Sequence, residues 1–213
     1  MREAFSFLSK HSAELTSFAQ ALIRTESVHG NETAVAKVIQ RQLKRYGIRS
    51  SLLGKDSQRK SLLADIGRHG PILMLNGHLD TVPLGNLRLW KHDPLSGKIV
   101  AGKIYGRGSY DMKCSVAAAT YAAIAFAHAT SPSLGRIRLL FNFDEESGHH
   151  AGVKDALRRG ITADSAICAE PMYDRTLNIG ARGIFRCELT AHGRSGHTGY
   201  KGSGVNAVTI MAK

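Results

Sequence analysis

Two residues that can bind a metal or carry a proton interrupt an apolar run early in the chain. The segment LMLNGHLDTVP (residues 73–83) has the pattern of a buried strand, yet it contains His78 and Asp80. Residues two apart in an extended chain point to the same side. Burying an imidazole and a carboxylate costs free energy unless a partner satisfies both groups. The segment therefore indicates a bound cation or another polar partner.

Further carboxylates follow other predicted elements. Asp111 comes after the glycine-rich YGRGSYD and opens an apolar helix, Asp144, Glu145 and Glu146 end the strand RIRLLFNF, and Glu170 ends SAICAE. Ligands of an open α/β sheet collect beyond the carboxyl ends of its strands, so we expect these acids and the histidine at one edge. Such a cluster without a cation would repel itself. Mixed imidazole and carboxylate ligands suit zinc, and also manganese or cobalt.

Each of these signals has a structural alternative. A lone H-x-D motif is usually structural, and Asp111 could simply cap its helix. An acidic pair at a strand end is most often a solvated loop, and Glu170 before Pro171 could be an ordinary loop carboxylate. Only their joint placement at one sheet edge favours a metal site.

These residues need a scaffold of alternating strands and helices. Apolar residues at helical spacing predict a helix over residues 3–23 and a second one after Asn31, a good N-cap, which Gly47 ends. A buried helix is predicted from Asp111 and a short one over 151–159. Strands are predicted over residues 48–53, 61–66, 72–76, 136–143 and 165–170, with a hairpin-like stretch over 97–109. This alternation predicts an α/β fold with a parallel-rich mixed sheet flanked by helices.

The pattern changes after residue 178. Residues 182–193 alternate apolar and polar, as a half-solvated strand does, and residues 203–213 resemble the start of a helix with Asn206 near its cap. One strand and one helix cannot bury a core of their own. We therefore expect residues 1–178 to form the main domain and residues 179–213 to begin a second, incomplete one.

Composition narrows the functional classes. The net charge is +12, but the Lys and Arg residues are scattered and no basic run is interleaved with aromatics. Solvated basic faces explain the charge better than nucleic-acid binding, which has no other support. The three cysteines, Cys114, Cys168 and Cys187, form no C-x-x-C pair. They argue against a disulfide framework and fit a reducing compartment. No secretory signal or membrane span is recognisable, so we expect a cytoplasmic protein without membrane partners.

Four motifs, in order, resemble a known family of enzymes. GHLDTVP, GKIYGRGSYDMK, NFDEESG and AEP are similar to motifs of the two-zinc amidohydrolases and metallopeptidases, which include acetylornithine deacetylase, succinyl-diaminopimelate desuccinylase, aminoacylase and glutamate carboxypeptidase. The resemblance covers essentially the whole chain. It implies the N-terminal part of a catalytic domain over residues 1–178 and the start of a small α+β lid or dimerisation domain over 179–213.

The resemblance also implies an activity and its cofactors. It implies hydrolysis of amide bonds in N-acyl amino acids or small peptides that carry a carboxylate, as in amino-acid metabolism. Two zinc ions are implied, with cobalt or manganese as alternatives, and a homodimer formed through the lid is implied as well. The implied metal ligands are His78, Asp111 as the bridge, Glu146 and Glu170, while Asp80 would orient His78.

The remaining roles come from the same resemblance. Glu145 would be the general base. GRSGHTGYKGSGVNAV resembles the opening of the lid, where His197 would stabilise the oxyanion. GARG resembles the turn into the lid, so Arg182 would pair with a substrate carboxylate. The alternatives are a polar loop histidine and a solvent-facing arginine.

Two departures from the family pattern affect these expectations. Cys114 follows DMK, where the family usually has glycine. The last metal ligand of the family is a histidine that follows the lid, and no residue of this sequence matches it. We therefore expect either an amidohydrolase or a truncated, catalytically impaired fragment that binds metal or a partner chain without turnover.

Overall fold

The computed structural model describes residues 2–129, 135–172, 176–177, 179–180, 183, 185, 187–200 and 202–213. The chain divides into two compact units, residues 1–172 and 173–213, and each unit is described by itself. The catalytic and lid roles expected for residues 1–178 and 179–213 stay predictions.

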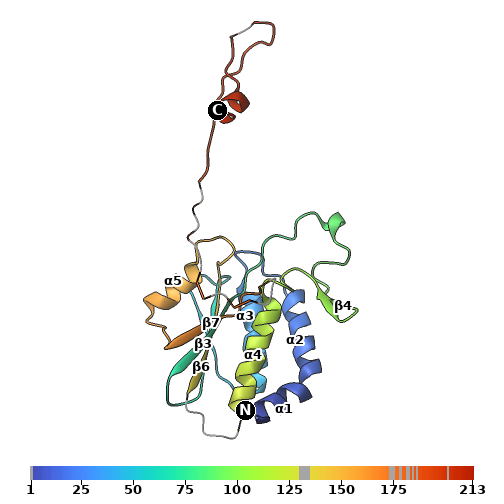
Figure 1. The fold of residues 1–213 in the computed structure, drawn as a ribbon, viewed down its shortest axis with the longest axis vertical. Helices are drawn as coiled ribbons and strands as arrows, with labels where there is room; N and C mark the ends of the chain where they lie inside the picture. Colours follow the sequence, from blue (N-terminus) through green and yellow to red (C-terminus); the bar gives the residue numbers. More distant parts are fainter. Residues whose placement is uncertain are drawn as a thin grey trace. The chain divides into compact units, whose positions relative to one another are not determined.

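A five-stranded sheet with the order β1-β2-β6-β3-β7 organises the first unit (Figure 1). Strand β3 pairs in parallel with both β6 and β7, whereas β2 pairs antiparallel with β6 and with β1. The predicted parallel-rich mixed sheet is confirmed. The strands are β1 Ser51–Leu53, β2 Ser61–Ile66, β3 Ile72–His78, β6 Arg136–Asn142 and β7 Ser165–Cys168. All four residues of β7 are exposed, and no further strand among the described residues pairs with it.

Helices cover both faces of this sheet. Leu139 of β6 belongs to the main apolar core, which α2, α3 and α4 complete, whereas Leu140 packs with Ala156 of α5 in a smaller core. Successive strand residues point to opposite faces, so α5 lies on the face opposite the other helices. The helices of this unit are α1 Arg2–Lys10, α2 Ser12–Arg24, α3 Thr33–Arg45, α4 Lys113–His128 and α5 Ala151–Arg158. A short 3-10 helix, Leu87–Leu89, and the hairpin of β4 Lys98–Val100 and β5 Lys103–Tyr105 complete it.

Helix α5 begins very close to the end of β6. A Cβ atom added to Gly152 would lie 2.5 Å from the carbonyl oxygen of Phe143 and 2.8 Å from its nitrogen. Backbone atoms cannot move aside as a flexible side chain can, so only glycine fits at this position. The loop between β6 and α5 is thereby held tightly at both ends.

Two helix boundaries differ from the prediction. The single helix predicted over residues 3–23 is two helices, α1 and α2, which meet at His11. The backbone leaves the helical region there (φ −105°, ψ 15°), and the ring Nδ1 of His11 lies 2.8 Å from the carbonyl oxygen of Phe7. Helix α3 begins after Glu32 instead of after Asn31, because the Glu32 side chain is buried and accepts the N–H of Gly30.

The described residues of the second unit include one short helix, α6 Ala207–Met211. The side chain of Asn206 accepts the N–H groups of Val208 and Thr209, so the predicted cap is confirmed. The described residues of 182–193 contain no strand, which corrects the prediction there. Alternation alone cannot make a strand without a partner to complete the ladder. Among the described residues that follow, an isolated bridge joins Arg194 to Val205.

Among the residues that the structure describes, no helix combines the length and the apolar character needed to cross a membrane.

Leucine 139 and leucine 157 give a matched test of this core. Leu139 is fully buried, whereas Leu157 is 59% exposed. We expect Leu139→Ala to reduce the free energy of unfolding by about 2–5 kcal/mol, because a cavity is left behind. Leu157→Ala should change it by no more than about 0.5 kcal/mol. Urea unfolding followed by circular dichroism measures both values, and equal losses would contradict this placement of the core.

Candidate metal centre

The parallel strands bring their final residues to one edge of the sheet. His78 ends β3 and lies directly beside Asn142, which ends β6. Strand β7 ends at Cys168, two residues before Glu170. The loops after these strands therefore leave the sheet at the same edge, as expected for parallel strands. Asp111, which lies two residues before α4, reaches this edge from the same unit.

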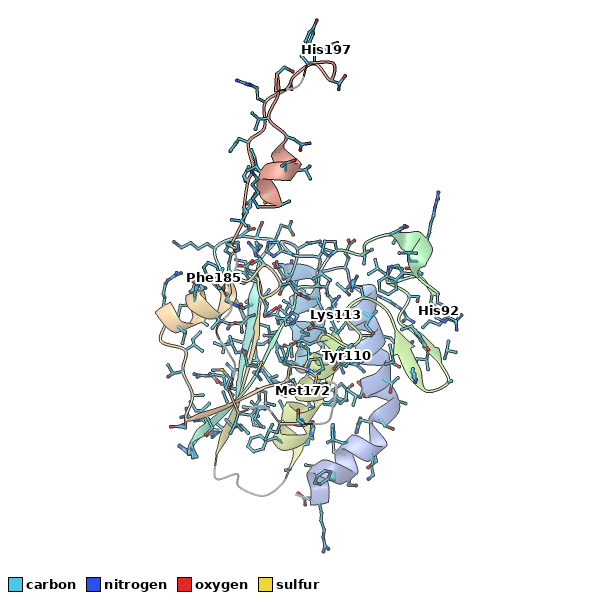
Figure 2. The ribbon with its side chains drawn as sticks, turned by 45° about the horizontal axis from the view of Figure 1, so that its top comes forward. His92, Tyr110, Lys113, Met172, Phe185 and His197 are labelled. Atoms are coloured by element: carbon cyan, nitrogen blue, oxygen red, sulfur yellow. The ribbon has the colours of Figure 1, made fainter. Side chains whose placement is uncertain are left out.

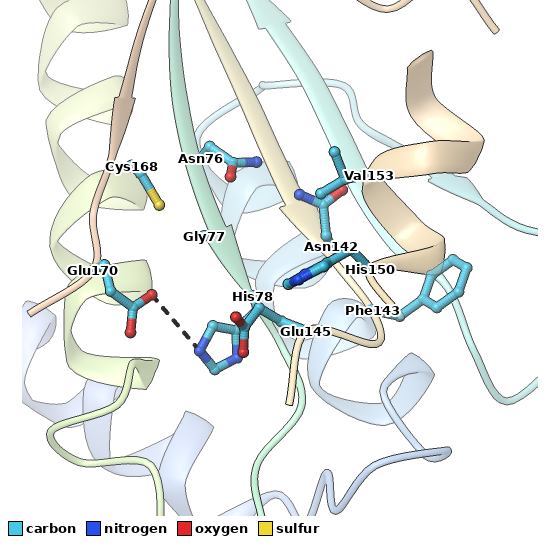
Figure 3. A pocket seen from close by; sticks show the side chains of 10 residues that line it. All are labelled: Asn76, Gly77, His78, Asn142, Phe143, Glu145, His150, Val153, Cys168 and Glu170. Atoms are coloured by element: carbon cyan, nitrogen blue, oxygen red, sulfur yellow. Dashed lines mark ion pairs between the residues drawn. The ribbon is translucent and has the colours of Figure 1, made fainter. Parts of the chain in front are cut away.

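Four residues predicted as metal ligands lie together there. His78, Asp111 and Glu146 each offer a ligand atom within 4.8 Å of the other two. The Nε2 atom of His78 is 2.8 Å from Asp111 Oδ1 and 3.9 Å from Glu170 Oε2. Figure 3 shows the Glu170 carboxylate facing the imidazole ring. Asp111 is close to each of the other three, which is the position required of a bridging ligand.

Asp80 lies on the other side of His78. The Nδ1 atom of His78 donates to the backbone carbonyl oxygen of Asp80 at 2.9 Å and lies 3.5 Å from its Oδ1. This contact directs Nε2 toward Asp111, in the way that supporting hydrogen bonds orient metal-binding histidines. The carboxylate of Asp80 also accepts the backbone N–H groups of Glu145 (3.1 Å) and Glu146 (2.9 Å). Asp80 thus contacts both the histidine and the acidic loop, residues 144–148.

Burial and neighbouring charges shift the pKa values of this cluster. Burial by itself would lower the pKa of His78, but the contacts with Asp80 and Asp111 raise it to about 10. Burial and the nearby charge of Asp111 raise the pKa of Glu170 to about 7, and the same two causes raise the pKa of Glu146. Protons therefore reduce carboxylate repulsion when no cation does so.

The donor set fits divalent metal ions. One imidazole nitrogen and three carboxylates converge on one small volume, and such mixed nitrogen and oxygen ligands suit zinc, cobalt and manganese. A bound cation would neutralise the acids in place of protons. The residues present therefore fit a metal centre, while the metal's identity and the individual roles stay predictions.

Glu145 faces a cavity beside the cluster. The cavity has a volume of about 410 Å³, and Glu145 and His78 both line it (Figure 3). The backbone N–H of Glu145 donates to Asp80, which fixes the residue next to the candidate ligands. Its carboxylate is therefore available there. The cavity is lined by Asn76, Gly77, His78, Asn142, Phe143, Glu145, His150, Val153, Cys168 and Glu170.

Other predicted residues fall elsewhere. His197, labelled in Figure 2, is exposed in the second unit, where its Nδ1 accepts the N–H of Gly199 at 3.1 Å. His197 belongs to a different unit from the candidate ligands, so the oxyanion role of His197 stays a prediction. Arg182 lies outside the described residues. Cys114 is half-buried and packs against the main core, so its thiol is accommodated where the family usually has glycine.

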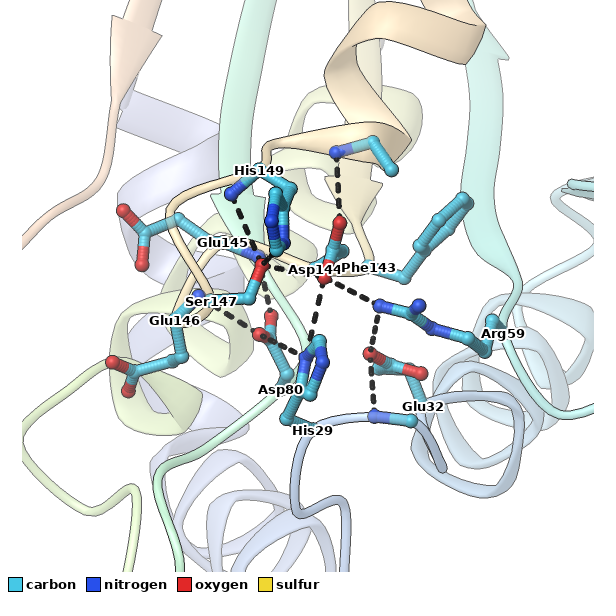
Figure 4. Close-up of polar contacts among 12 residues, drawn as sticks. His29, Glu32, Arg59, Asp80, Phe143, Asp144, Glu145, Glu146, Ser147 and His149 are labelled. Atoms are coloured by element: carbon cyan, nitrogen blue, oxygen red, sulfur yellow. Dashed lines mark hydrogen bonds and ion pairs between the residues drawn. The ribbon is translucent and has the colours of Figure 1, made fainter. Parts of the chain in front are cut away.

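A second polar cluster behind the candidate ligands was not predicted from the sequence. Asp144 pairs with Arg59 and lies 3.2 Å from Nδ1 of His29 (Figure 4). Glu32 is fully buried near Arg59, and burial raises its pKa. No spacing rule links residues so far apart in the chain. The one available signal was Asp144 itself, a third acid beside the glutamate pair.

Comparisons with known proteins agree with this geometry. The sequence model of Peptidase family M20/M25/M40 matches residues 74–209. Succinyl-diaminopimelate desuccinylase of Methylorubrum extorquens (strain PA1) is 35% identical over 206 residues, which cover 91% of this chain and 53% of that protein. The chain spans about half the length of the curated relatives it matches.

Solved structures share the fold. An M20 family metallo-carboxypeptidase from Sulfolobus solfataricus aligns with a TM-score of 0.63 at 22% identity, over 73% of this chain and 37% of that one. The Bacillus subtilis YXEP protein, described as a dinuclear metal binding peptidase, aligns with a TM-score of 0.52 at 20% identity, over 72% of this chain and 40% of that one.

Zinc binding should release protons. At pH 7, His78 with a pKa of about 10 is protonated, and Glu170 with a pKa of about 7 is partly protonated, yet both must lose their protons to coordinate. We expect release of about one to two protons per chain at pH 7, and weaker binding as the pH falls. Calorimetric titrations in buffers of different ionisation enthalpy measure this number. Zinc binding without proton release would contradict the arrangement, and His78→Ala, which removes the most basic ligand, serves as the control.

Proposed function

The chain belongs to Peptidase family M20/M25/M40, and on this premise we propose that it carries the catalytic residues of a metal-dependent amide hydrolase. One observation carries the proposal: His78, Asp111 and Glu146 offer ligand atoms within 4.8 Å of one another at the sheet edge, and Glu170 Oε2 lies 3.9 Å from His78 Nε2. The carboxylates of Asp111, Glu146 and Glu170 are partly exposed and repel one another. These two features are expected of a centre that receives cations.

Each residue has a defined task in the proposed reaction. His78, Asp111, Glu146 and Glu170 would hold two divalent cations, preferentially zinc. These would supply Lewis-acid activation of the scissile carbonyl and of the attacking water. Glu145 would accept a proton from that water on its carboxylate and deliver it to the leaving nitrogen. Its position is favourable because it faces the cavity beside the ligands.

The proposed substrates are N-acyl amino acids or small peptides. The family resemblance and the relative named succinyl-diaminopimelate desuccinylase support this class. The cavity of about 410 Å³ has the size of a small-molecule site. Arg182 for the substrate carboxylate, His197 for the oxyanion and a homodimer formed through residues 179–213 remain parts of the proposal. A cytoplasmic location fits the free cysteines Cys114, Cys168 and Cys187.

Substitution of the two neighbouring glutamates separates base from ligand. Glu145→Gln should leave zinc affinity within about threefold, but lower turnover of N-acetyl or N-succinyl amino acids about 100-fold or more, because proton transfer is lost. Glu146→Gln should weaken zinc binding about tenfold or more, because it replaces a charged ligand by a neutral amide.

Calorimetric zinc titration and a turnover assay of both variants decide the assignment. Equal impairment of zinc binding in the two variants would show that the roles are wrong. Tight zinc binding without turnover in the unsubstituted chain would favour the alternative of a chain that binds metal or a partner without catalysis.

A further inference from the structure

We propose that Asp144, Arg59 and His29 are positioning residues that fix the acidic loop, residues 144–148, and so determine where Glu145 and Glu146 point. The catalytic importance of this positioning rests on the proposed function, in which Glu145 is the base and Glu146 is a ligand. The contacts that carry the inference do not depend on it.

The acidic loop begins with an unusual backbone conformation. Asp144 has a φ of 67°, in the left-handed region that few residues other than glycine adopt readily. Aspartate and asparagine are the best tolerated exceptions. The chain turns there at the end of β6, and the next two residues are the glutamates. A conformation that is not intrinsically preferred needs fixed contacts to hold it.

The side chain of Asp144 supplies those contacts. It is 3% exposed, and its Oδ1 accepts from the Arg59 guanidinium and from Ser147 Oγ at 2.7 Å. Its Oδ2 accepts the N–H of Ala151, the first residue of α5, at 3.1 Å. His29 Nδ1 lies 3.2 Å from Oδ1. Figure 4 shows these partners arranged around the carboxylate. Asp144 therefore fixes the start of the loop to three other segments of the first unit.

Arg59 is itself held in place. Its guanidinium lies 3.6 Å from Oε1 of the fully buried Glu32 and 5.3 Å from the centre of the Phe143 ring. Three sides of the guanidinium are thus occupied by Glu32, Phe143 and Asp144. A cation so constrained is a fixed anchor for the loop, unlike an exposed arginine that samples many rotamers.

Asp80 holds the same loop from the side of the metal centre. Its two carboxylate oxygens accept the N–H groups of Glu145 and Glu146, and His29 Nδ1 lies 3.9 Å from Oδ2. The backbone of both glutamates is therefore fixed between Asp80 and Asp144. Catalytic groups need such support because small displacements of a ligand or base lower its effectiveness.

A cation site is the competing explanation for part of this cluster. His29, Glu32 and Asp80 offer ligand atoms within 4.8 Å of one another. However, Arg59 already provides a positive charge beside Glu32, and both oxygens of Asp80 accept backbone N–H groups. These contacts favour positioning over a further metal.

Amide hydrogen exchange tests the inference in the metal-free protein. In Arg59→Met and Asp144→Ala we expect the amides of Glu145 and Glu146 to exchange about tenfold faster or more, because the loop opens locally. Asp144→Asn keeps an acceptor and tolerates the left-handed backbone, so it should retain most of the protection. Should Asp144→Ala fail to fold, Arg59→Met and the surface variant His29→Ala carry the same expectation.

A matched control is available on β6, the strand that precedes the acidic loop. Arg138 makes a two-pronged ion pair with Asp65, at 2.6 and 2.9 Å, away from the candidate ligands. Arg138→Met likewise removes an arginine–carboxylate pair from the first unit. It should leave exchange at Glu145 and Glu146 unchanged. Acceleration equal to that of Arg59→Met would reduce the effect to general destabilisation and overturn the inference.

Cobalt provides the second readout. Arg59→Met should change the visible ligand-field spectrum of the cobalt-loaded protein and weaken zinc binding about tenfold, whereas Arg138→Met should match the unsubstituted chain in both. Unchanged exchange and an unchanged spectrum would overturn the inference even if zinc binds well. An unsubstituted chain that binds no zinc contradicts the proposed function instead, and the exchange data then decide the inference alone. A further bound ion that His29→Ala abolishes would also overturn it.

Discussion

The repulsion between carboxylates is the constraint on which this structure depends, because many of them lie at one edge of a sheet beside a single buried histidine. These acidic residues fall into two groups. Asp80, Asp144 and Glu32 are buried, and each has an N–H, guanidinium or imidazole partner. Glu146 and Glu170 are partly exposed, and burial together with Asp111 raises their pKa values. The first group is paired within the protein, although Oε2 of Glu32 has no hydrogen-bond partner. The second group repels itself until protons or a cation neutralise it.

Close packing at two glycines brings these two groups of acids together. Gly77 lies between two polar residues of β3, and a Cβ atom there would be 2.7 Å from Met112 Cε. Met112 follows Asp111 directly, and its sulfur accepts the N–H of His78 at 3.2 Å. The start of α4 is thereby packed onto the end of β3, which places Asp111 beside the imidazole. Gly152 likewise allows the start of α5 to pack closely against the residue that follows β6.

Local patterns predicted what depends on local chemistry. The apolar strands, the buried helix α4 and the Asn206 cap follow from periodicity and capping, and the gathering of the acids near His78 follows from their place at strand ends. Local patterns wrongly predicted a strand over 182–193, because alternation says nothing about a pairing partner, and the described residues there contain no strand. They also could not predict the contact of Arg59 with Asp144, which lies 85 residues away. Glu145 and Glu146 are chemically identical neighbours, so only the family resemblance could separate their expected roles.

The exposed strand β7 has a consequence for how the protein behaves in concentrated solution. Its outer side offers backbone N–H and C=O groups that no described strand occupies, next to the exposed side chain of Ile167. It also carries neither lysine nor proline, which often protect sheet edges. Such an edge is a template for intermolecular pairing. Colloidal stability will therefore depend on whether this edge is covered, independently of how well the metal centre is formed.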